Sequence, residues 1–325
     1  MNIWNPENYH GKGKKIFFEG WYFKHTDTLK KYVFAVIPGI SLGKDSHSFI
    51  QIIDNNNFSK YYRFSITDFK YINNPFSVII GNNFFSLEKL VLNLEDFSAD
   101  LNFENIKPWP VNLFNPGAMG PYGFLNFLEC YHGILSFNHN VHGTVTVKGE
   151  KKDYSNGNGY IEKDWGKSFP KSWIWASSNN FENYDASFSA SIANVPFGKS
   201  YFVGFIIGFY LNGKIYQFTT YNGAKIYDLE NNENKISFKV VRKKYLIEVE
   251  IIKNEGNILL APKNGDMIGR VNESLSSEIK IVFKENNNTI FSSKGIHAGL
   301  EVNGDIIMDI KNDKKRKIFL KNNKF

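Results

Sequence analysis

Residues Ile236–Lys253 read ISFKVVRKKYLIEVEIIK, and apolar and polar side chains alternate along most of this stretch. Alternation at every second residue is typical of a β-strand with one buried face and one exposed face. The shorter stretch Glu278–Phe283 (EIKIVF) repeats the pattern. Both stretches therefore favour an antiparallel sheet with one face packed against a core and the other face exposed to solvent.

The rest of the chain is consistent with that interpretation. Asn-Gly pairs follow apolar runs at Asn212–Gly213, Asn222–Gly223 and Asn303–Gly304, and this dipeptide is a strong short-range signal for a β-hairpin. No long segment has the spacing of an amphipathic helix, and Tyr122–Tyr131 is the best short helical candidate. The sequence thus predicts an all-β protein built from antiparallel barrels or sandwiches.

The length predicts two domains. The chain has 325 residues, of which 42% are hydrophobic and 16% aromatic, enough for two cores of ordinary size. A polar stretch at Gly149–Gly159 suggests the boundary, so we expect domains at residues 1–150 and 151–310 and a basic tail at 311–325. The similar blocks FFEGWYF and YIEKDWG could be equivalent strands of two related domains.

The positive charge is concentrated at one end. The net charge is +7, but residues 311–325 carry seven Lys or Arg and one Asp, which leaves about +1 for the remainder. A nucleic-acid surface would spread its positive charge over a folded face, so we do not expect nucleic acid as a partner. The tail is expected to be solvated.

The sequence favours a cytoplasmic protein. The single Cys130 excludes an intrachain disulfide, the start lacks the apolar core of a signal peptide, and the longest apolar run, Tyr201–Leu211, has 11 residues. A bilayer-spanning helix needs about 20 residues. At most a peripheral membrane contact is expected, and the oligomeric state stays open.

Several kinds of site are disfavoured. His132, His139 and His142 have no recognisable zinc-ligand spacing, so no metal is expected. The stretch GKGKK at Gly11–Lys15 lacks the glycine spacing of a phosphate-binding loop. Cys130 lies near His132 without an evident oxyanion loop.

Carboxylates beside large aromatic rings are the remaining lead. Glu19 lies in FFEGWYFK, and Glu162 and Asp164 lie in YIEKDWGKSFPKSWIW, close to Trp165, Trp173 and Trp175. On a strand, Glu162 and Asp164 share one face. Burial among rings raises a carboxyl pKa, so such acids can remain protonated and donate a proton. Alternatively they cap turns or pair with neighbouring lysines.

The same two blocks, Phe17–Lys24 and Tyr160–Trp175, resemble the tocopherol cyclase family. Weaker similarity continues through Gly213–Gly223, Ala261–Gly269 and Gly295–Gly304, and residues 55–142 are most similar to the bacterial members. The resemblance implies two lipocalin-like β-barrel domains related to carotenoid hydratases, with a hydrophobic pocket near the domain junction. It also implies closure of a prenylated hydroquinone to a chroman ring, an isomerisation that needs neither a redox cofactor nor a metal.

The resemblance and the residues together suggest roles. Asp164 replaces the Asn of the plant pattern EKNWG, so Glu162 is the safer proton donor, with Glu19 as a second candidate and Asp164 as its partner. The expected substrate-binding residues are aromatic or imidazole side chains: Trp21, Tyr22, His132, Trp165, Trp173 and Trp175. Two alternatives stay open, namely a non-catalytic binder of a hydrophobic isoprenoid or lipid, and a hydratase of an isoprenoid double bond.

Overall fold

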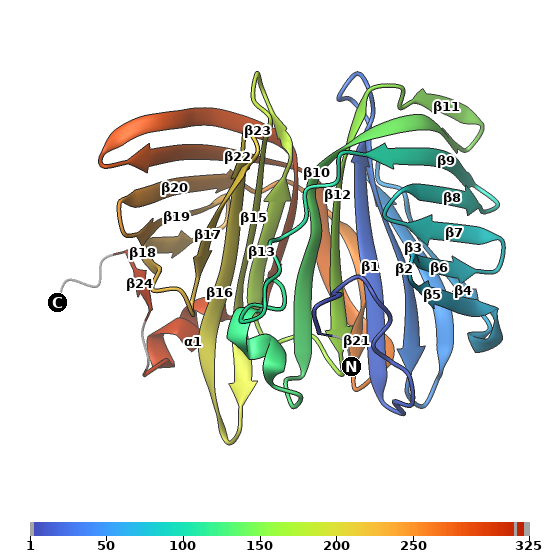
Figure 1. Cartoon of the computed structure of the whole chain (residues 1–325), viewed down its shortest axis with the longest axis horizontal. Coiled ribbons are helices and arrows are strands. Elements are labelled where there is room, and N and C mark those ends of the chain that lie inside the picture. The colour runs from blue at the N-terminus through green and yellow to red at the C-terminus, as the bar shows by residue number, and fades with distance from the viewer. Residues whose placement is uncertain (1–2, 315–316, 322–325) are drawn as a thin grey trace. The chain divides into compact units, whose positions relative to one another are not determined.

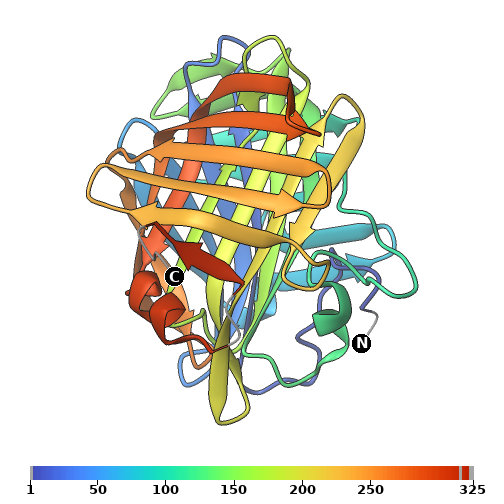
Figure 2. The same cartoon turned by 90° about the vertical axis from the view of Figure 1, so that its left-hand side faces the viewer.

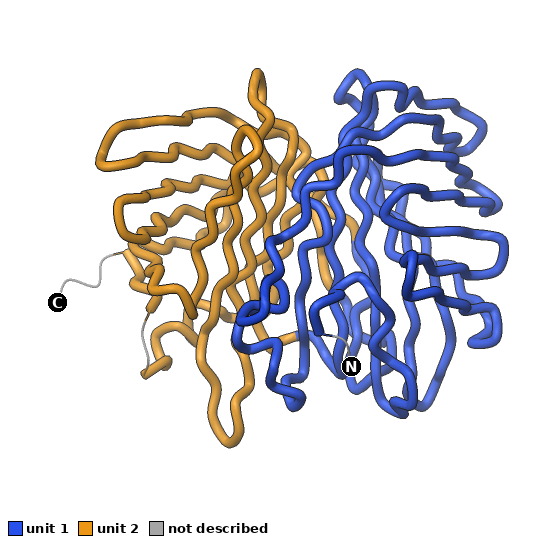
Figure 3. Tube along the Cα trace, in the orientation of Figure 1, with its two compact units in different colours: residues 1–169, 258–270 blue, residues 170–257, 271–325 orange. Residues whose placement is uncertain are grey.

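The structure, a computed structural model, describes residues 3–314 and 317–321. The chain forms two compact units, coloured separately in Figure 3. The first unit contains residues 1–169 and 258–270, and the second contains 170–257 and 271–325. The division therefore falls after Phe169 and not near residue 150.

The first unit is a curled antiparallel sheet (Figure 1). Its strands pair in the order β4-β3-β2-β1-β12-β10-β9-β8-β7-β6-β5, and β11 pairs with β10. The strands are β1 (Phe17–Thr26), β2 (Val33–Leu42), β3 (His47–Asp54), β4 (Ser59–Phe64), β5 (Phe69–Asn73), β6 (Phe76–Ile80), β7 (Asn83–Ser86), β8 (Lys89–Asn93), β9 (Phe97–Glu104), β10 (Cys130–Val147), β11 (Glu150–Asp153) and β12 (Gly157–Gly166).

The sheet curls because one face of most strands is apolar. Trp21 and Phe23 of β1 pack in the same cluster as Val78 of β6, Phe85 of β7 and Leu90 of β8, strands far from β1 in the pairing order. Burying these alternating side chains against one another closes the first unit around a single core.

The second unit is built on the second sheet. Its main path is β17-β16-β15-β13-β23-β22-β20-β19-β18-β24, with β14 paired to β23 and β21 to β22. The strands of this sheet are β13 (Trp173–Ser178), β14 (Asn180–Phe181), β15 (Ala186–Phe197), β16 (Ser200–Leu211), β17 (Lys214–Thr219), β18 (Lys225–Asn231), β19 (Lys235–Arg242), β20 (Tyr245–Ile252), β21 (Asn257–Lys263), β22 (Asp266–Glu285), β23 (Asn288–Asn303) and β24 (Ile318–Leu320). Residues 258–270, which form most of β21 and the start of β22, belong to the first unit.

This second sheet also folds over on itself. In Figure 2 its orange and red strands run crosswise in front of its yellow-green strands. Ile192 of β15, Phe209 of β16, Val249 of β20 and Ile281 of β22 belong to one buried cluster between these two parts of the sheet. The prediction of an all-β protein with two antiparallel barrel-like sheets is confirmed.

Helical structure is short throughout the described ranges. It consists of the 3-10 helices η1 (Ile66–Asp68) and η2 (Gly120–Phe124) and the α-helix α1 (Ile306–Asn312). The helix predicted at Tyr122–Tyr131 is wrong, because η2 ends at Phe124 and Cys130 already begins β10. Among the residues described, no helix is long and apolar enough to cross a membrane.

The hairpin predictions are partly correct. Asn212–Gly213 joins the paired strands β16 and β17, and both residues have positive φ, as a tight hairpin turn requires. Asn222–Gly223 is a turn between β17 and β18, which do not pair, and Asn303–Gly304 leads into α1. The hairpin prediction is wrong at these last two positions.

Two further expectations are wrong. FFEGWYF and YIEKDWG are not equivalent strands of two domains, because they belong to β1 and β12, which pair with each other. The basic tail is not wholly solvated, since Ile318–Leu320 forms β24 beside β18 and buries Ile318 and Leu320. Residues 315–316 and 322–325 of that tail lie outside the described residues.

Candidate functional site

The two acid-aromatic motifs meet across one pair of strands in the first unit. Glu19 of β1 lies opposite Trp165 of β12, and Tyr22 lies opposite Glu162. Directly opposed residues point to the same side of a sheet, and successive residues alternate. Glu19 and Trp165 therefore share the core-facing side with Trp21, whereas Glu162 and Asp164 share the other side. Glu19 and Glu162 do not face one common cavity.

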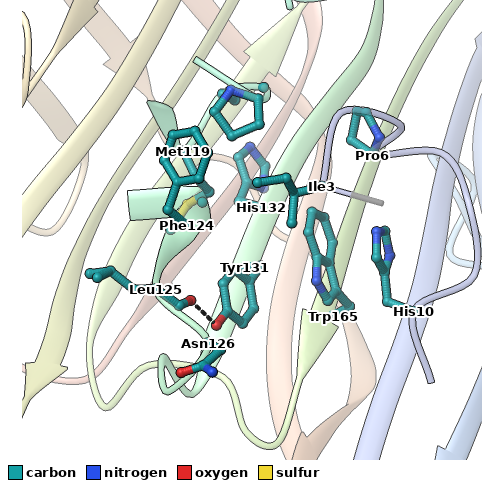
Figure 4. A pocket seen from close by; sticks show the side chains of 14 residues that line it. Ile3, Pro6, His10, Met119, Phe124, Leu125, Asn126, Tyr131, His132 and Trp165 are labelled. Atoms are coloured by element: carbon teal, nitrogen blue, oxygen red, sulfur yellow. Dashed lines mark hydrogen bonds between the residues drawn. The ribbon is translucent and has the colours of Figure 1, made fainter. Parts of the chain in front are cut away.

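A pocket lies at this end of the first unit (Figure 4). Its volume is about 110 Å³. The lining comes from the N-terminal segment, the η2 region, the start of β10 and the end of β12. The lining residues are Ile3, Pro6, His10, Pro116, Gly117, Ala118, Met119, Gly123, Phe124, Leu125, Asn126, Tyr131, His132 and Trp165.

Aromatic rings form a stack along one wall. The ring centroids of His10 and Trp165 are 4.6 Å apart with an interplanar angle of 9°, and those of Tyr131 and Trp165 are 5.5 Å apart at 11°. Figure 4 shows the Trp165 ring between the other two. Such a flat apolar wall suits an aromatic ligand, and its π-faces attract positive charge.

His132 connects the pocket to the two carboxylates of the EKD motif. Its Nδ1 lies 3.0 Å from Oδ1 of Asp164, and its Nε2 lies 3.9 Å from Oε2 of Glu162. The hydroxyl of Tyr160 donates to Glu162 Oε2 at 2.5 Å. The shared face predicted for Glu162 and Asp164 is confirmed by their opposition to Ile134 and His132 of β10.

The charge on His132 follows from its neighbours. Burial alone would lower its pKa, but the charges of Asp164 and Glu162 and the hydrogen bond to Asp164 outweigh burial and raise the pKa to about 9. His132 is therefore an imidazolium at neutral pH. Its buried Nε2 has no hydrogen-bond partner within the described part of the chain, which leaves an N–H for a ligand.

A second histidine reaches the pocket from the core-facing side. His10 Nδ1 lies 2.9 Å from Glu19 Oε1 and 3.0 Å from Lys163 Nζ, and the His10 backbone N–H donates to both Glu19 oxygens. Lys163 Nζ lies 2.5 Å from Glu19 Oε1, and both of these side chains are fully buried. Burial and the nearby Lys163 charge lower the pKa of His10, so this imidazole is neutral.

Lys163 also fastens the N-terminal segment that forms part of the pocket wall. Its ammonium donates to the carbonyl oxygens of Pro6 and Asn8 and lies between the rings of Trp21 and Trp165, 4.6 and 4.9 Å from their centroids. Burial lowers its pKa to about 8, against the opposing effect of Glu19. Trp21 Nε1 donates to Glu7 O of the same segment at 2.8 Å.

The predicted binding residues have different positions. His132 and Trp165 line the pocket. Trp21 is part of the first core, and Tyr22 lies on β1 beside Glu162. Trp173 and Trp175 lie on β13 in the second unit, where Trp173 Nε1 donates to Glu301 Oε2 at 2.7 Å, and neither lines this pocket.

Sequence reasoning missed His10, Lys163 as a site residue, and the wall made by residues 116–126. A signal for Lys163 was present, since alternation places it on the opposite face from Glu162 and Asp164. His10 gave no signal, because its contacts depend on the pairing of β1 with β12.

One set of side chains in the described structure has the geometry to hold a metal ion. It is the same His132, Glu162 and Asp164, whose ligand atoms lie within 4.8 Å of one another. One imidazole and two carboxylates suit a divalent cation of intermediate hardness. Such an ion would displace the proton on His132, so a metal ion and a proton would compete for the same imidazole nitrogen.

A steric constraint explains why glycine ends the EKDWG motif. Gly166 has a φ of +149°, and a Cβ at this position would lie 2.1 Å from the carbonyl oxygen of Glu129. Only glycine lets β12 pass so close to the start of β10. This close approach places Trp165 beside Tyr131 in the pocket wall.

Comparisons with known proteins agree with this architecture. The AttH structure from Nitrosomonas europaea has a TM-score of 0.55 at 10% identity and covers 92% of this chain and 95% of that chain. CghA with Sch210972 has a TM-score of 0.58 at 10% identity, with 89% of each chain covered. At such identity these similarities show the fold, which is lipocalin-like.

Two relatives in sequence are plant proteins. A probable chloroplastic tocopherol cyclase of Oryza sativa subsp. japonica is 26% identical over 175 residues, which is 50% of this chain and 37% of that protein. The chloroplastic tocopherol cyclase of Zea mays is 27% identical over 132 residues, which is 37% of this chain and 26% of that protein. The matches thus span well under half of either relative. A family model described as tocopherol cyclase-like matches residues 100–304, and the chain therefore belongs to the tocopherol cyclase-like family.

Proposed function

We propose that this protein catalyses the acid-catalysed ring closure of a prenylated hydroquinone, or of a similar isoprenoid phenol, to a chroman. Family membership and the names of the two plant relatives support the reaction class. The observation that carries the proposal is the position of His132 at the pocket wall, with its Nδ1 3.0 Å from Asp164 Oδ1 and its Nε2 3.9 Å from Glu162 Oε2.

The reaction uses one proton from the protein and returns one proton to it. The cluster of His132, Glu162 and Asp164 donates one proton to the trisubstituted alkene, and a tertiary carbocation forms. The phenol oxygen bonds to that carbon and loses its own proton. His10, a neutral imidazole whose Nε2 has no hydrogen-bond partner among the described residues, accepts it. Transfer back to the cluster restores the starting state, with no change in redox level.

The groups of the cluster act as one acid. Their protons are shared among interacting sites, so the donor is the cluster and not one carboxyl group alone. Asp164 and Glu162 stabilise the positive charge of the His132 imidazolium, and Tyr160 orients Glu162. Glu19 lies on the other face of the sheet and acts through His10.

The pocket fits the aromatic end of such a substrate. A cavity of about 150 Å³ binds benzene in a protein core, so 110 Å³ accepts about one ring. A long prenyl chain would extend out of the pocket, whose apolar lining includes Phe124 and Leu125. Trp165 and Tyr131 stabilise the carbocation by about 0.5–2 kcal/mol for each well-placed ring.

The direct test uses the full chain and a prenylated hydroquinone. Ring closure gives a product of unchanged mass with a shifted chromatographic retention. A product heavier by one water would instead identify a hydratase. Recovery of unchanged but tightly bound quinol would identify a binder, and either result would overturn the cyclase proposal.

Variants locate the acid. Glu162→Gln and His132→Gln are each expected to abolish turnover with folding intact, because each removes a member of the proton-sharing cluster. The matched control is His142→Gln, on the same strand β10 but outside the pocket, with a side chain that is 41% exposed. Normal turnover by Glu162→Gln would remove Glu162 from the mechanism.

A further inference from the structure

The segment Pro108–Leu128, which joins β9 to β10, has an unusual surface composition. These residues contain no Asp, Glu, Lys or Arg. Val111, Leu113, Phe114, Phe124 and Phe127 are exposed, and so is Trp4, whose ring lies 6.1 Å from that of Phe124. Exposed apolar side chains gathered on one uncharged segment mark an interaction surface.

Hydrogen bonds hold the most exposed part of this segment in place. Asn112 and Asn115 exchange backbone hydrogen bonds, and Asn112 Oδ1 accepts from the backbone N–H groups of Phe114 and Asn115. The tip of this turn is Leu113–Phe114, with exposed fractions of 70% and 76%. Tight turns ordinarily carry polar residues at the tip, so this one presents two large apolar side chains to the surroundings.

The segment is also anchored to the first unit. Trp109 is buried and stacks on Phe137 with ring centroids 5.8 Å apart, and its backbone N–H donates to Ile134 O. The Tyr131 hydroxyl donates to Leu125 O. Between these anchors, Pro116, Met119 and Phe124 line the pocket. The exposed surface is therefore continuous with the pocket mouth.

Basic side chains follow a lining residue of the same pocket closely in the sequence. Lys12, Lys14 and Lys15 are exposed and follow His10, a lining residue, within five positions. At about 3.5 Å per residue, even Lys15 lies within about 18 Å of His10 along the chain. An uncharged apolar segment on the pocket wall, together with exposed lysines that follow another lining residue, is complementary to an anionic lipid surface, where apolar side chains enter the acyl boundary and cations face the head groups.

We propose that Pro108–Leu128 docks the protein on an anionic lipid bilayer, with Leu113 and Phe114 inserted and Lys12, Lys14 and Lys15 at the head groups. The choice of a bilayer as occupant rests partly on the proposed function, since a prenylated quinol partitions into membranes. The surface itself does not depend on turnover. A docked pocket mouth takes its ligand directly from the lipid phase.

The test is flotation of the full chain with vesicles in the absence of any quinol. Wild type is expected to float with vesicles of phosphatidylcholine and phosphatidylglycerol, and less with phosphatidylcholine alone. Leu113→Ser with Phe114→Ser should lower the partition coefficient at least about tenfold, because two large apolar side chains no longer insert. Replacing Lys12, Lys14 and Lys15 by Gln should lower it by roughly fivefold for each lysine at low salt.

The matched control is Leu29→Ser, which removes an equally exposed leucine (68%) from the turn at the other end of β1. This control should float like wild type, and thermal melting should show that all variants fold. Wild type that stays unbound with every vesicle overturns the proposal and leaves a protein partner as the occupant. So does a Leu113→Ser, Phe114→Ser chain that floats like wild type.

The outcomes separate this proposal from the proposed function. With detergent-dispersed quinol, Leu113→Ser with Phe114→Ser should turn over like wild type, since neither residue lines the pocket. With quinol embedded in vesicles it should be slower. A chain that floats but never closes the ring refutes the cyclase proposal and leaves the docking surface standing.

Discussion

His132 Nδ1 lies 3.0 Å from Oδ1 of Asp164. The contact joins β10 to its neighbour β12 at the point where the two residues face each other in the register. Burial alone would keep this histidine neutral, but the negative charge of Asp164, with a second one on Glu162 nearby, raises its pKa and makes it a cation. The pocket thus has a charged imidazole on one side and the neutral imidazole of His10 on the other. Opposed protonation states of this kind are how one site supplies both an acid and a base.

Asp164→Asn tests this pair. Losing the carboxylate should lower the pKa of His132 from about 9 by roughly one to three units. Ring closure should then decline at a correspondingly lower pH on the alkaline side, and a nuclear magnetic resonance titration of the His132 ring should show the same shift. His142→Gln should move neither curve. An unchanged His132 titration in Asp164→Asn would show that the Asp164 carboxylate does not raise the pKa of His132.

The same pKa sets a stability trend. His132 titrates near 6.5 when unfolded and near 9 when folded, so its contribution is complete below about pH 6.5 and is lost as the pH rises through 9. The full contribution is about 3 kcal/mol at 1.36 kcal/mol per unit. Urea unfolding of wild type and His132→Gln between pH 6 and 10 should show two curves that converge at the alkaline end.

Much of the fold followed from alternation along the strands, and so did the common face of Glu162 and Asp164. A boundary expected near residue 150 separates Gly157–Gly166 from its partner strand β1, because local pattern does not reveal a partner about 140 residues away. The face of the sheet on which Glu19 lies could not be predicted for the same reason. Only the pairing of β1 with β12 shows that Glu19 points to the core side, where its Oε1 lies 2.9 Å from His10 Nδ1. Pockets walled by loops, such as residues 116–126, leave no periodic trace in a sequence.

Lys163→Met is expected to be strongly destabilising. The variant leaves the Glu19 carboxylate fully buried without its ammonium partner and removes the anchor of the Pro6 and Asn8 carbonyls. Breaking such a buried pair costs about 3–5 kcal/mol. Urea unfolding measures the loss, and limited proteolysis should cut the N-terminal segment faster.

A double-mutant cycle with Glu19→Gln isolates the ion pair. The neutral amide removes the uncompensated charge, so the double variant should be destabilised by clearly less than the sum of the two single variants. Strict additivity would mean that Lys163 acts only through the backbone carbonyls of the N-terminal segment.

Gly166→Ala should disrupt the pocket wall. The new Cβ would meet Glu129 O at 2.1 Å on a backbone with φ of +149°. Gly149→Ala provides a comparison, because Gly149 also has positive φ (+85°) but open space around its Cβ position. The control should lose about 1 kcal/mol from backbone strain alone. Gly166→Ala should lose clearly more and should weaken Trp165 fluorescence quenching by added phenol; equal losses would show that β12 moves freely away from β10.

The core of the first unit contains a pair of buried histidines that should make it sensitive to acid. Burial lowers the pKa of His25 well below its usual range and that of His139 to about 3, and their ring centroids lie 5.7 Å apart. Below pH 6.5 these histidines bind protons in the unfolded chain but not in the folded chain. The free energy of unfolding therefore decreases as the pH is lowered. The slope reaches about 1.4 kcal/mol per pH unit for each histidine and persists down to about pH 3 for His139.

His25→Leu removes half of that sensitivity. Neither ring nitrogen of His25 has a hydrogen-bond partner among the residues described, and leucine has a similar volume without a polar atom. Relieving the unsatisfied nitrogens should raise the free energy of unfolding by about 1–3 kcal/mol at pH 7. The gain over wild type should then grow as the pH falls from 6.5 to 4, which urea titrations at half-unit steps can follow. A gain that stays constant with pH would mean that His25 does not remain neutral in the fold.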